Sequence, residues 1–204
     1  MSNQIQIQTK DEDKKIVELK DVTVQLNKVF RGILKENLDY GQIPGTPKPS
    51  LWKPGAELLG IYFKLSTGDP VIEKTENLEK PYFAYVVQQR FFNIAGRLVG
   101  VGVGAANTGE TRYAFRKVWD PDYNKMTDEE KAKCVKRKGS WYLPTPPDEI
   151  FTLQNTVLKM AKKRAFVDGI LAITGADRIF TQDVDEDNET ERIKEAKPVN
   201  NKLA

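Results

Sequence analysis

The 204-residue sequence contains no histidine and a single cysteine, Cys134. Without histidine, a Ser-His-Asp triad, imidazole acid–base catalysis and an HExxH-type metal site are all excluded. One cysteine excludes an intramolecular disulfide framework and a multi-cysteine zinc site. Acidic residues do not cluster within the expected core, where they would be needed for carboxylate–metal chemistry. These absences predict a protein that is not an enzyme and that uses no metal or other cofactor.

Long apolar runs are also missing. A hydrophobic content of 39% and a charged content of 30% are typical of a soluble globular protein. No stretch has the pattern of a transmembrane helix or a signal peptide. We therefore expect an intracellular protein without a membrane partner, whose length suits one domain with its own core.

The net charge of +3 is distributed unevenly along the chain. From Thr181 onward, seven acidic and four basic residues give a net charge of −3, so the preceding 180 residues carry +6. A basic body with an acidic polar tail is common among nucleic-acid-binding proteins, but also among proteins without that function. We expect residues 1–9 and 181–204 to be disordered and residues 10–180 to form one domain.

The first expected element is an amphipathic helix from Lys10 to Asn37. Thr9 and Glu12 form a capping-box pattern before it. One apolar stripe follows at helical spacing, formed by Ile16, Leu19, Val22, Leu26, Val29, Phe30, Ile33 and Leu34. The stripe predicts a core contact or a subunit contact.

Prolines and glycines dominate the next stretch, 38–63, and predict a long ordered loop. Pro54 suits the first turn of a short helix at its end. Lys48, Trp52 and Lys53 flank the start of this helix, where unpaired backbone N–H groups can hold a phosphate. A structural crossover with a buried Trp52 is an equally good interpretation.

A β pattern extends from Val71 to Trp119. Residues 82–94 and 98–105 predict a hairpin around a turn at 93–97. Three alternate glycines of the second strand share one face, which indicates that another element approaches closely; they are Gly100, Gly102 and Gly104. A packed helix is the favoured neighbour, and a nucleic-acid backbone is the alternative.

A further strand is expected from Thr111 to Trp119. Two sets of residues would alternate along it, Arg112, Ala114 and Arg116 on one side and Tyr113, Phe115 and Trp119 on the other. In such an arrangement rings stack on bases and cations pair with phosphates. Residues 120–147 then predict an insertion that contains a short basic helix. Thr127 and Glu130 form the capping box of this helix.

The last predicted helix runs from about Pro147 to Ile173 and ends at Gly175. One face carries Val157, Leu158, Ala161, Ala165 and Ala172. The opposite face carries Lys159, Lys162, Lys163 and Phe166. Arg164 is spaced to pair with Asp168. The lysine face suits a phosphate backbone, because fixed cations displace condensed counterions; the solvated face of an ordinary helix is the alternative.

Together these elements predict an α+β fold. An antiparallel β-sheet of three to four strands would pack on one long basic α-helix, preceded by the N-terminal amphipathic helix. Carboxyl-rich and histidine-containing sites are absent from this scheme, whereas basic and aromatic residues recur in it.

Three segments resemble the single-strand annealing proteins of the Rad-fifty-two type, especially their phage relatives. The first is the loop LDYGQI (38–43) with KPGAE (53–57), and the second is GVGVG (100–104). The third is KMAKKRA (159–165) with VDG (167–169). The resemblance covers roughly residues 37–174; the insertion at 120–147 is absent from the eukaryotic members.

The resemblance implies a hairpin sheet packed on the basic helix and subunits in rings whose outer groove holds single-stranded DNA. It also implies ATP-independent pairing of complementary strands in recombination and repair. A lysine-arginine step on the family's basic helix contacts DNA, and Lys163-Arg164 matches it. An alignment on the VDG segment would instead place Leu171-Ala172 there.

From the residues and the resemblance together, we expect a protein that binds single-stranded DNA and promotes annealing. The expected contact residues are Lys48, Lys53, Arg112, Tyr113, Arg116, Lys159, Lys162, Lys163 and Arg164. Expected partners are single-stranded DNA, further copies of the chain in a ring or filament, and a replication or recombination protein at the acidic tail. The expected location is the cytoplasm, that of the host if a phage encodes the chain.

Three alternatives remain open at this point. The first is a protein that coats single strands without annealing them. The second is a structural adaptor whose lysines are merely solvated. The third is a magnesium-dependent nuclease, which the sparse acidic residues of the basic region disfavour.

Overall fold

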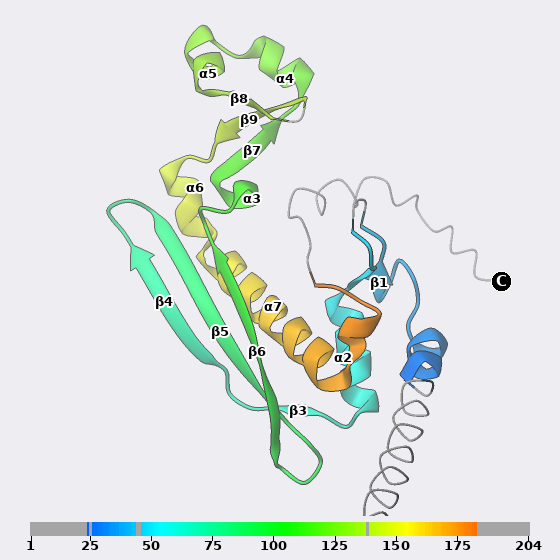
Figure 1. Ribbon diagram of the computed structural model, residues 1–204. Coiled ribbons are helices and arrows are strands. Elements are labelled where there is room, and N and C mark those ends of the chain that lie inside the picture. Colours follow the sequence, from blue (N-terminus) through cyan, green and yellow to red (C-terminus); the bar gives the residue numbers. More distant parts are fainter. Residues whose placement is uncertain (1–23, 25, 44–45, 138, 183–204) are drawn as a thin grey trace, which may run out of the picture.

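The computed structural model describes residues 24, 26–43, 46–137 and 139–182, and these form an α+β structure with antiparallel sheets (Figure 1). The predicted fold class is thereby confirmed. The helix α7 (Gln154–Thr174) is the longest described element. It runs along the main sheet in Figure 1.

The main sheet is built around β5 (Tyr82–Phe92). On one side β5 pairs with β6 (Leu98–Asn107), and on the other with β4 (Val71–Asn77) and β3 (Ser66–Thr67). The predicted hairpin is therefore confirmed. Its turn is closed by Asn93, whose side-chain oxygen accepts hydrogen bonds from the backbone N–H groups of Ala95 and Arg97, both at 3.0 Å.

The glycine face of β6 packs directly on α7. A β-carbon at Gly104 would lie 2.5 Å from the carbonyl oxygen of Ala161, and one at Gly102 would lie 2.7 Å from the Cα of Gly169. Residues with side chains at these positions would push the helix off the sheet. The close neighbour of the glycines is thus a helix, the favoured of the two interpretations.

The contact follows one row of α7 residues at intervals of four. Gly104 meets Ala161, Gly102 meets Ala165 and Gly169, and Gly100 meets the side chain of Ile173. Ala161 and Ala165 are buried as predicted, but Ala172 is exposed. The prediction for Ala172 was wrong because β6 crosses the helix obliquely, so that the contact reaches Ile173 by the last turn.

Two groups of buried side chains form the core. One lies between α7, the helical residues 26–33 and α2 (Lys53–Tyr62), and its largest members include Phe30, Leu59 and Phe91. The other lies between β5 and the first half of α7 and includes Phe83 and Tyr85. α7 belongs to both groups, so it connects the two halves of the core.

The N-terminal helix ends at Ile33 and not at Asn37 as predicted. The chain turns there because the Asp39 carboxylate accepts a hydrogen bond from the Lys35 backbone N–H (2.8 Å), and Asn37 adopts a left-handed conformation with φ of 63°. The predicted start at Lys10 lies outside the described residues. So does the predicted disorder of residues 1–9.

The loop that follows contains two short strands, β1 (Tyr40–Gly41) and β2 (Ser50–Leu51), which pair with each other. Pro54 lies in the first turn of α2, as predicted. Trp52 is half-buried, with its ring over Gly41. Thr181 was assigned to the tail, but it exchanges backbone hydrogen bonds with Pro49 and Leu51. The remainder of the predicted tail, from Asp183, lies outside the described residues.

The segment predicted as a strand from Thr111 to Trp119 begins instead with a helical turn, α3 (Thr111–Ala114). β7 (Phe115–Val118) follows. The turn forms because the backbone N–H groups of Tyr113 and Ala114 both donate to the Glu110 carbonyl. The predicted alternation of arginines with aromatic residues along one strand is therefore wrong.

The predicted insertion, 120–147, forms a small sheet together with β7, which precedes it, in the order β7-β9-β8. β8 spans Val135–Arg137 and β9 spans Ser140–Pro144. Two short helices precede them, α4 (Asp120–Lys125) and α5 (Asp128–Lys133), and α5 has the predicted capping box of Thr127 and Glu130. We call residues 115–144 the extension, which projects past the N-terminal end of α7 in Figure 1.

The long helix predicted from Pro147 to Ile173 is divided at Leu153 into α6 (Pro147–Thr152) and α7. Gly175 ends α7 in a left-handed conformation with φ of 69°, as predicted. In the parts of the chain described here, no helix is long and apolar enough to cross a membrane.

Candidate nucleic-acid interface

The lysines of α7 lie on the first half of the helix. Lys159 and Lys162 are exposed, whereas Lys163 is half-buried. The sheet covers the opposite side at Ala161 and Ala165. α2 covers the second half of the helix, where Gly60 approaches Ile170. The exposed cations are thus held on a helix that is fixed on its other faces.

Phe166 was predicted to lie among these lysines. Its ring instead packs against Phe91 of β5, with 5.5 Å between ring centroids. Phe166 therefore contributes to the core between α7, the sheet and α2, and it offers little surface for a base to stack on.

Arg164 is held by groups from two segments. Its guanidinium donates two hydrogen bonds to the Glu110 carboxylate, at 2.7 and 3.1 Å, and one to the Ala105 carbonyl at 2.6 Å. The Arg164 and Glu110 side chains are 24% and 12% exposed. A phosphate would have to compete with this ion pair, so Arg164 is better placed to organise the structure than to bind DNA.

Asp168, one turn after Arg164, also reaches β6. Its carboxylate accepts a hydrogen bond of 2.8 Å from the Val103 backbone N–H. Arg164 and Asp168 thus bind a carbonyl and an N–H group of the β6 edge that faces away from β5. The sequence spacing predicted that the two residues would pair, and it gave no signal that both would reach a strand.

Tyr113 and the two arginines around it do not form one surface. Tyr113 is buried in the core beside α7, so its ring cannot stack on a base. The Arg112 guanidinium lies over that ring at 5.4 Å. Arg116 is exposed on β7 and forms an ion pair of 3.1 Å with Glu149 of α6.

Lys48 and Lys53 lie near the start of α2, away from the lysines of α7. Lys48 donates a hydrogen bond to the Asp177 carbonyl (2.7 Å), and Lys53 pairs with Glu57. Lys48 also lines an open depression with Asp168 and Leu171. With a helical rise of about 1.5 Å per residue, Leu171 lies roughly 14 Å along the axis from Lys162.

Aromatic–cation contacts accumulate in the extension. The rings of Tyr123 and Trp141 stack in parallel, with centroids 4.1 Å apart. Lys136 lies over Trp141 at 5.2 Å, and Arg137 lies over the Phe115 ring at 4.3 Å. Lys136 and Arg137 are residues of β8. These contacts join α4 to the small sheet.

One carboxylate links β4 to the start of α7. Glu76 accepts hydrogen bonds from the Tyr85 hydroxyl (2.9 Å) and the Gln154 side chain (3.0 Å). The Tyr85 and Gln154 bonds lower the pKa of Glu76, with a smaller contribution from Lys74. Burial raises the pKa of Tyr85. Glu76 therefore stays ionised to a lower pH than a glutamate without these hydrogen bonds.

Among the described residues, no three His, Cys, Asp or Glu side chains are grouped so that they could hold a metal ion. Comparison with known proteins gives no further assignment, since no family model, no curated protein and no solved structure matches the chain.

Proposed function

We propose that the protein binds single-stranded DNA and promotes ATP-independent annealing of complementary strands in recombination and repair. The observation that carries the proposal is the pair of exposed lysines, Lys159 and Lys162, on a helix fixed by backbone contact with the sheet. Cations on a rigid element need little ordering before they meet a phosphate backbone. The resemblance in sequence points to the same activity.

Annealing follows from which part of the DNA the protein holds. Lys159, Lys162 and Lys163 neutralise phosphates and release their counterions. Phe166 packs against the core and Tyr113 is buried in it, so these two rings offer the bases near α7 little surface to stack on. The strand is then held by its backbone, and its bases stay available for a complement.

Assembly into a ring or filament accompanies this activity in our proposal. The face of the main sheet opposite α7 exposes apolar side chains, among them Val86, Val101 and Val103. Contiguous exposed apolar surface marks interaction sites in soluble proteins. β4 and β7 are also edge strands of their sheets, as predicted, and edge strands invite pairing.

The test of the proposal is an annealing assay with complementary oligonucleotides, without ATP and with or without magnesium. We expect duplex formation in both conditions and intact strands. Binding without duplex formation would favour a coating protein, and strand cleavage with magnesium would favour a nuclease. Absence of binding would favour an adaptor role.

The contribution of α7 is tested by changing Lys159, Lys162 and Lys163 together to Ala. Each lost phosphate contact lowers the slope of log K against log salt by about 0.7 for single strands. The matched control changes Lys28, Lys74 and Lys80, three exposed lysines outside α7, to Ala. An equal slope in both folded variants would remove α7 from the interface.

The acidic tail offers a second measurement. Deleting 183–204 removes a net charge of −3. If the tail competes with phosphates, truncation tightens binding at low salt. It has little effect at high salt, because salt shortens the Debye length and screens the charges of the tail. If the truncated and full chains bind with equal affinity at each salt concentration, the tail serves a replication or recombination partner or only solubility.

A further inference from the structure

A shallow pocket lies at the end of β7 in the extension. Its volume is about 220 Å³, and it is lined by Lys117, Val118, Trp119, Asp120, Gly139 and Ser140. Small-molecule sites are usually larger, about 300–1,000 Å³. The pocket is therefore too small for a whole cofactor and suits one planar group that belongs to a longer ligand.

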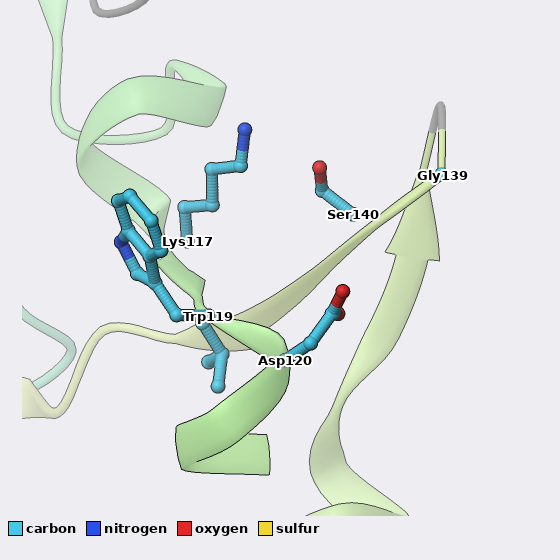
Figure 2. Close-up of a pocket in the computed structure, with 6 residues that line it drawn as sticks. Lys117, Trp119, Asp120, Gly139 and Ser140 are labelled. Atoms are coloured by element: carbon cyan, nitrogen blue, oxygen red, sulfur yellow. The ribbon is translucent and has the colours of Figure 1, made fainter. Parts of the chain in front are cut away.

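Trp119 presents such a planar surface. The residue is 58% exposed, an unusual position for the largest aromatic residue. The backbone at Trp119 is still extended, with φ of −76° and ψ of 145°. Residues two apart in an extended chain share a face, and Figure 2 accordingly shows Lys117 and Trp119 on the same side of the pocket.

The groups around the ring match the parts of a nucleotide. The indole can stack on a base, and the Lys117 ammonium can pair with a phosphate. Asp120 and Ser140 lie across the pocket from Trp119 (Figure 2). A carboxylate accepts hydrogen bonds from an exocyclic amine, and a hydroxyl group both donates and accepts, so they can contact a base edge.

The charge of the surrounding segment favours the same ligand. Residues 115–147 contain eight basic and five acidic residues. The acidic ones are concentrated at the starts of α4 and α5, where they complement the helix dipoles. A single strand carries a flat base beside each phosphate, so it supplies the group for Trp119 and the anion for the cations at once.

The backbone that carries Trp119 is held in place by its neighbours. Val118, its neighbour, is buried and pairs with Trp141 of β9. Trp141 is in turn stacked on Tyr123 of α4. Trp119 connects this strand directly to α4, so its backbone is anchored on both sides and little order has to be gained on binding.

We propose that Trp119 stacks on one base of a bound single strand while Lys117 pairs with a neighbouring phosphate. This inference rests on the proposed function and adds a contact to it. The α7 lysines hold the strand by its phosphates, whereas the extension holds one base. The extension then fixes the path of the strand beyond the end of α7.

The experiment measures binding of an oligodeoxycytidine, whose bases carry an exocyclic amine, by the full chain at physiological salt. Because Trp119→Ala removes the ring on which the base stacks, it should weaken binding about 5- to 150-fold. Trp119→Phe keeps a stacking ring and should lose much less affinity. It should also abolish most of the tryptophan fluorescence quenching that DNA causes in the wild type, which a merely structural role would not predict.

Lys117→Ala should lower the salt slope by about 0.7, the value for one phosphate contact. The matched control is Tyr62→Ala, an exposed aromatic residue on α2, which should leave affinity unchanged. Unchanged affinity in Trp119→Ala, with unchanged quenching in Trp119→Phe, would overturn this inference alone. A wild-type protein that binds no oligonucleotide would overturn the proposed function as well.

Discussion

The main sheet with α7 and the extension are both antiparallel sheets beside helices, but different forces hold them together. In the first, glycines of β6 let the backbone of α7 approach the strand directly, and two groups of buried side chains surround that contact. In the extension, Val118 and Leu143 are buried, and stacked rings with cations above them make most of the named contacts.

This difference separates two ways of building a binding surface. Close backbone packing leaves no room for adjustment, so it can hold the cations of α7 in fixed positions. Rings and long cationic side chains at a surface can exchange one partner for another at small cost. The comparison predicts that substitutions in the main sheet affect folding, whereas substitutions in the extension affect local order and binding.

The largest effect is expected where β6 meets α7. Gly102→Ala or Gly104→Ala places a methyl group against the helix backbone, which cannot move aside as a side chain can. Overpacking usually costs about 1–3 kcal/mol, and these positions should lie at or above the upper end. The measurement is the free energy of unfolding in urea.

Two matched glycines serve as controls for this prediction. At Gly100 a β-carbon meets the flexible side chain of Ile173, so the loss should be smaller. At Gly32, in the N-terminal helix, nothing lies within 4 Å, and alanine should stabilise the protein by up to about 1 kcal/mol. Equal losses at Gly100, Gly102 and Gly104 would contradict the backbone argument.

The next effect concerns the ion pair of Glu110 and Arg164, which lies beside the main sheet. Glu110→Gln removes the charge that two short hydrogen bonds engage, and we expect a loss of about 1.5–3 kcal/mol. Glu149→Gln, which breaks the exposed pair with Arg116 of the extension, should cost less than about 1 kcal/mol. A larger loss of stability for Glu149→Gln than for Glu110→Gln would contradict this prediction.

A smaller and local effect is expected for Trp141→Ala. It removes the ring stacked on Tyr123 and the ring under Lys136. Such aromatic pairs contribute about 0.5–1.5 kcal/mol beyond the area that they bury. Hydrogen exchange should accelerate in the extension and stay unchanged in β5 and α7. Accelerated exchange in β5 would show that the two regions unfold as one unit.

The smallest effect is the pH dependence at Glu76, which is exposed. Its hydrogen bonds lower the pKa in the folded protein below the ordinary value of 4.5. The resulting stabilisation is present above that value and is lost as the pH falls through the folded pKa. The stability difference between wild type and Glu76→Gln should therefore shrink as the pH falls below 4.5. A constant difference would show that the charge has no part in it.

Local patterns were sufficient to predict much of the main sheet. Asn93 and Gly96 identified the hairpin turn, and alternate glycines identified the strand that a helix approaches. Gly175 identified the end of α7, and Pro54 the start of α2. Each of these features depends on backbone conformations that a short stretch of sequence favours by itself.

The features that the sequence did not predict depend on distant partners. Tyr113 resembles a surface residue of a strand until the helical turn after Glu110 directs it into the core. Arg164 and Asp168 have the spacing of a helical pair, yet both bind β6. Trp119 was expected at the end of a basic and aromatic strand, but its exposure results from how β7 meets α4. Such outcomes follow from tertiary geometry, which residue spacing does not contain.

The way in which α7 covers β6 limits how copies of the chain can join. Arg164 and Asp168 bind backbone groups at the edge of β6 that faces away from β5, so a further strand cannot pair with β6 there. β4 is the opposite edge strand of the sheet and remains open. A sheet that can grow at one edge stops after a single neighbour is added. Continuous growth of the sheet from copy to copy is thereby blocked, and the proposed ring or filament would need a second, different surface to pass from one copy to the next.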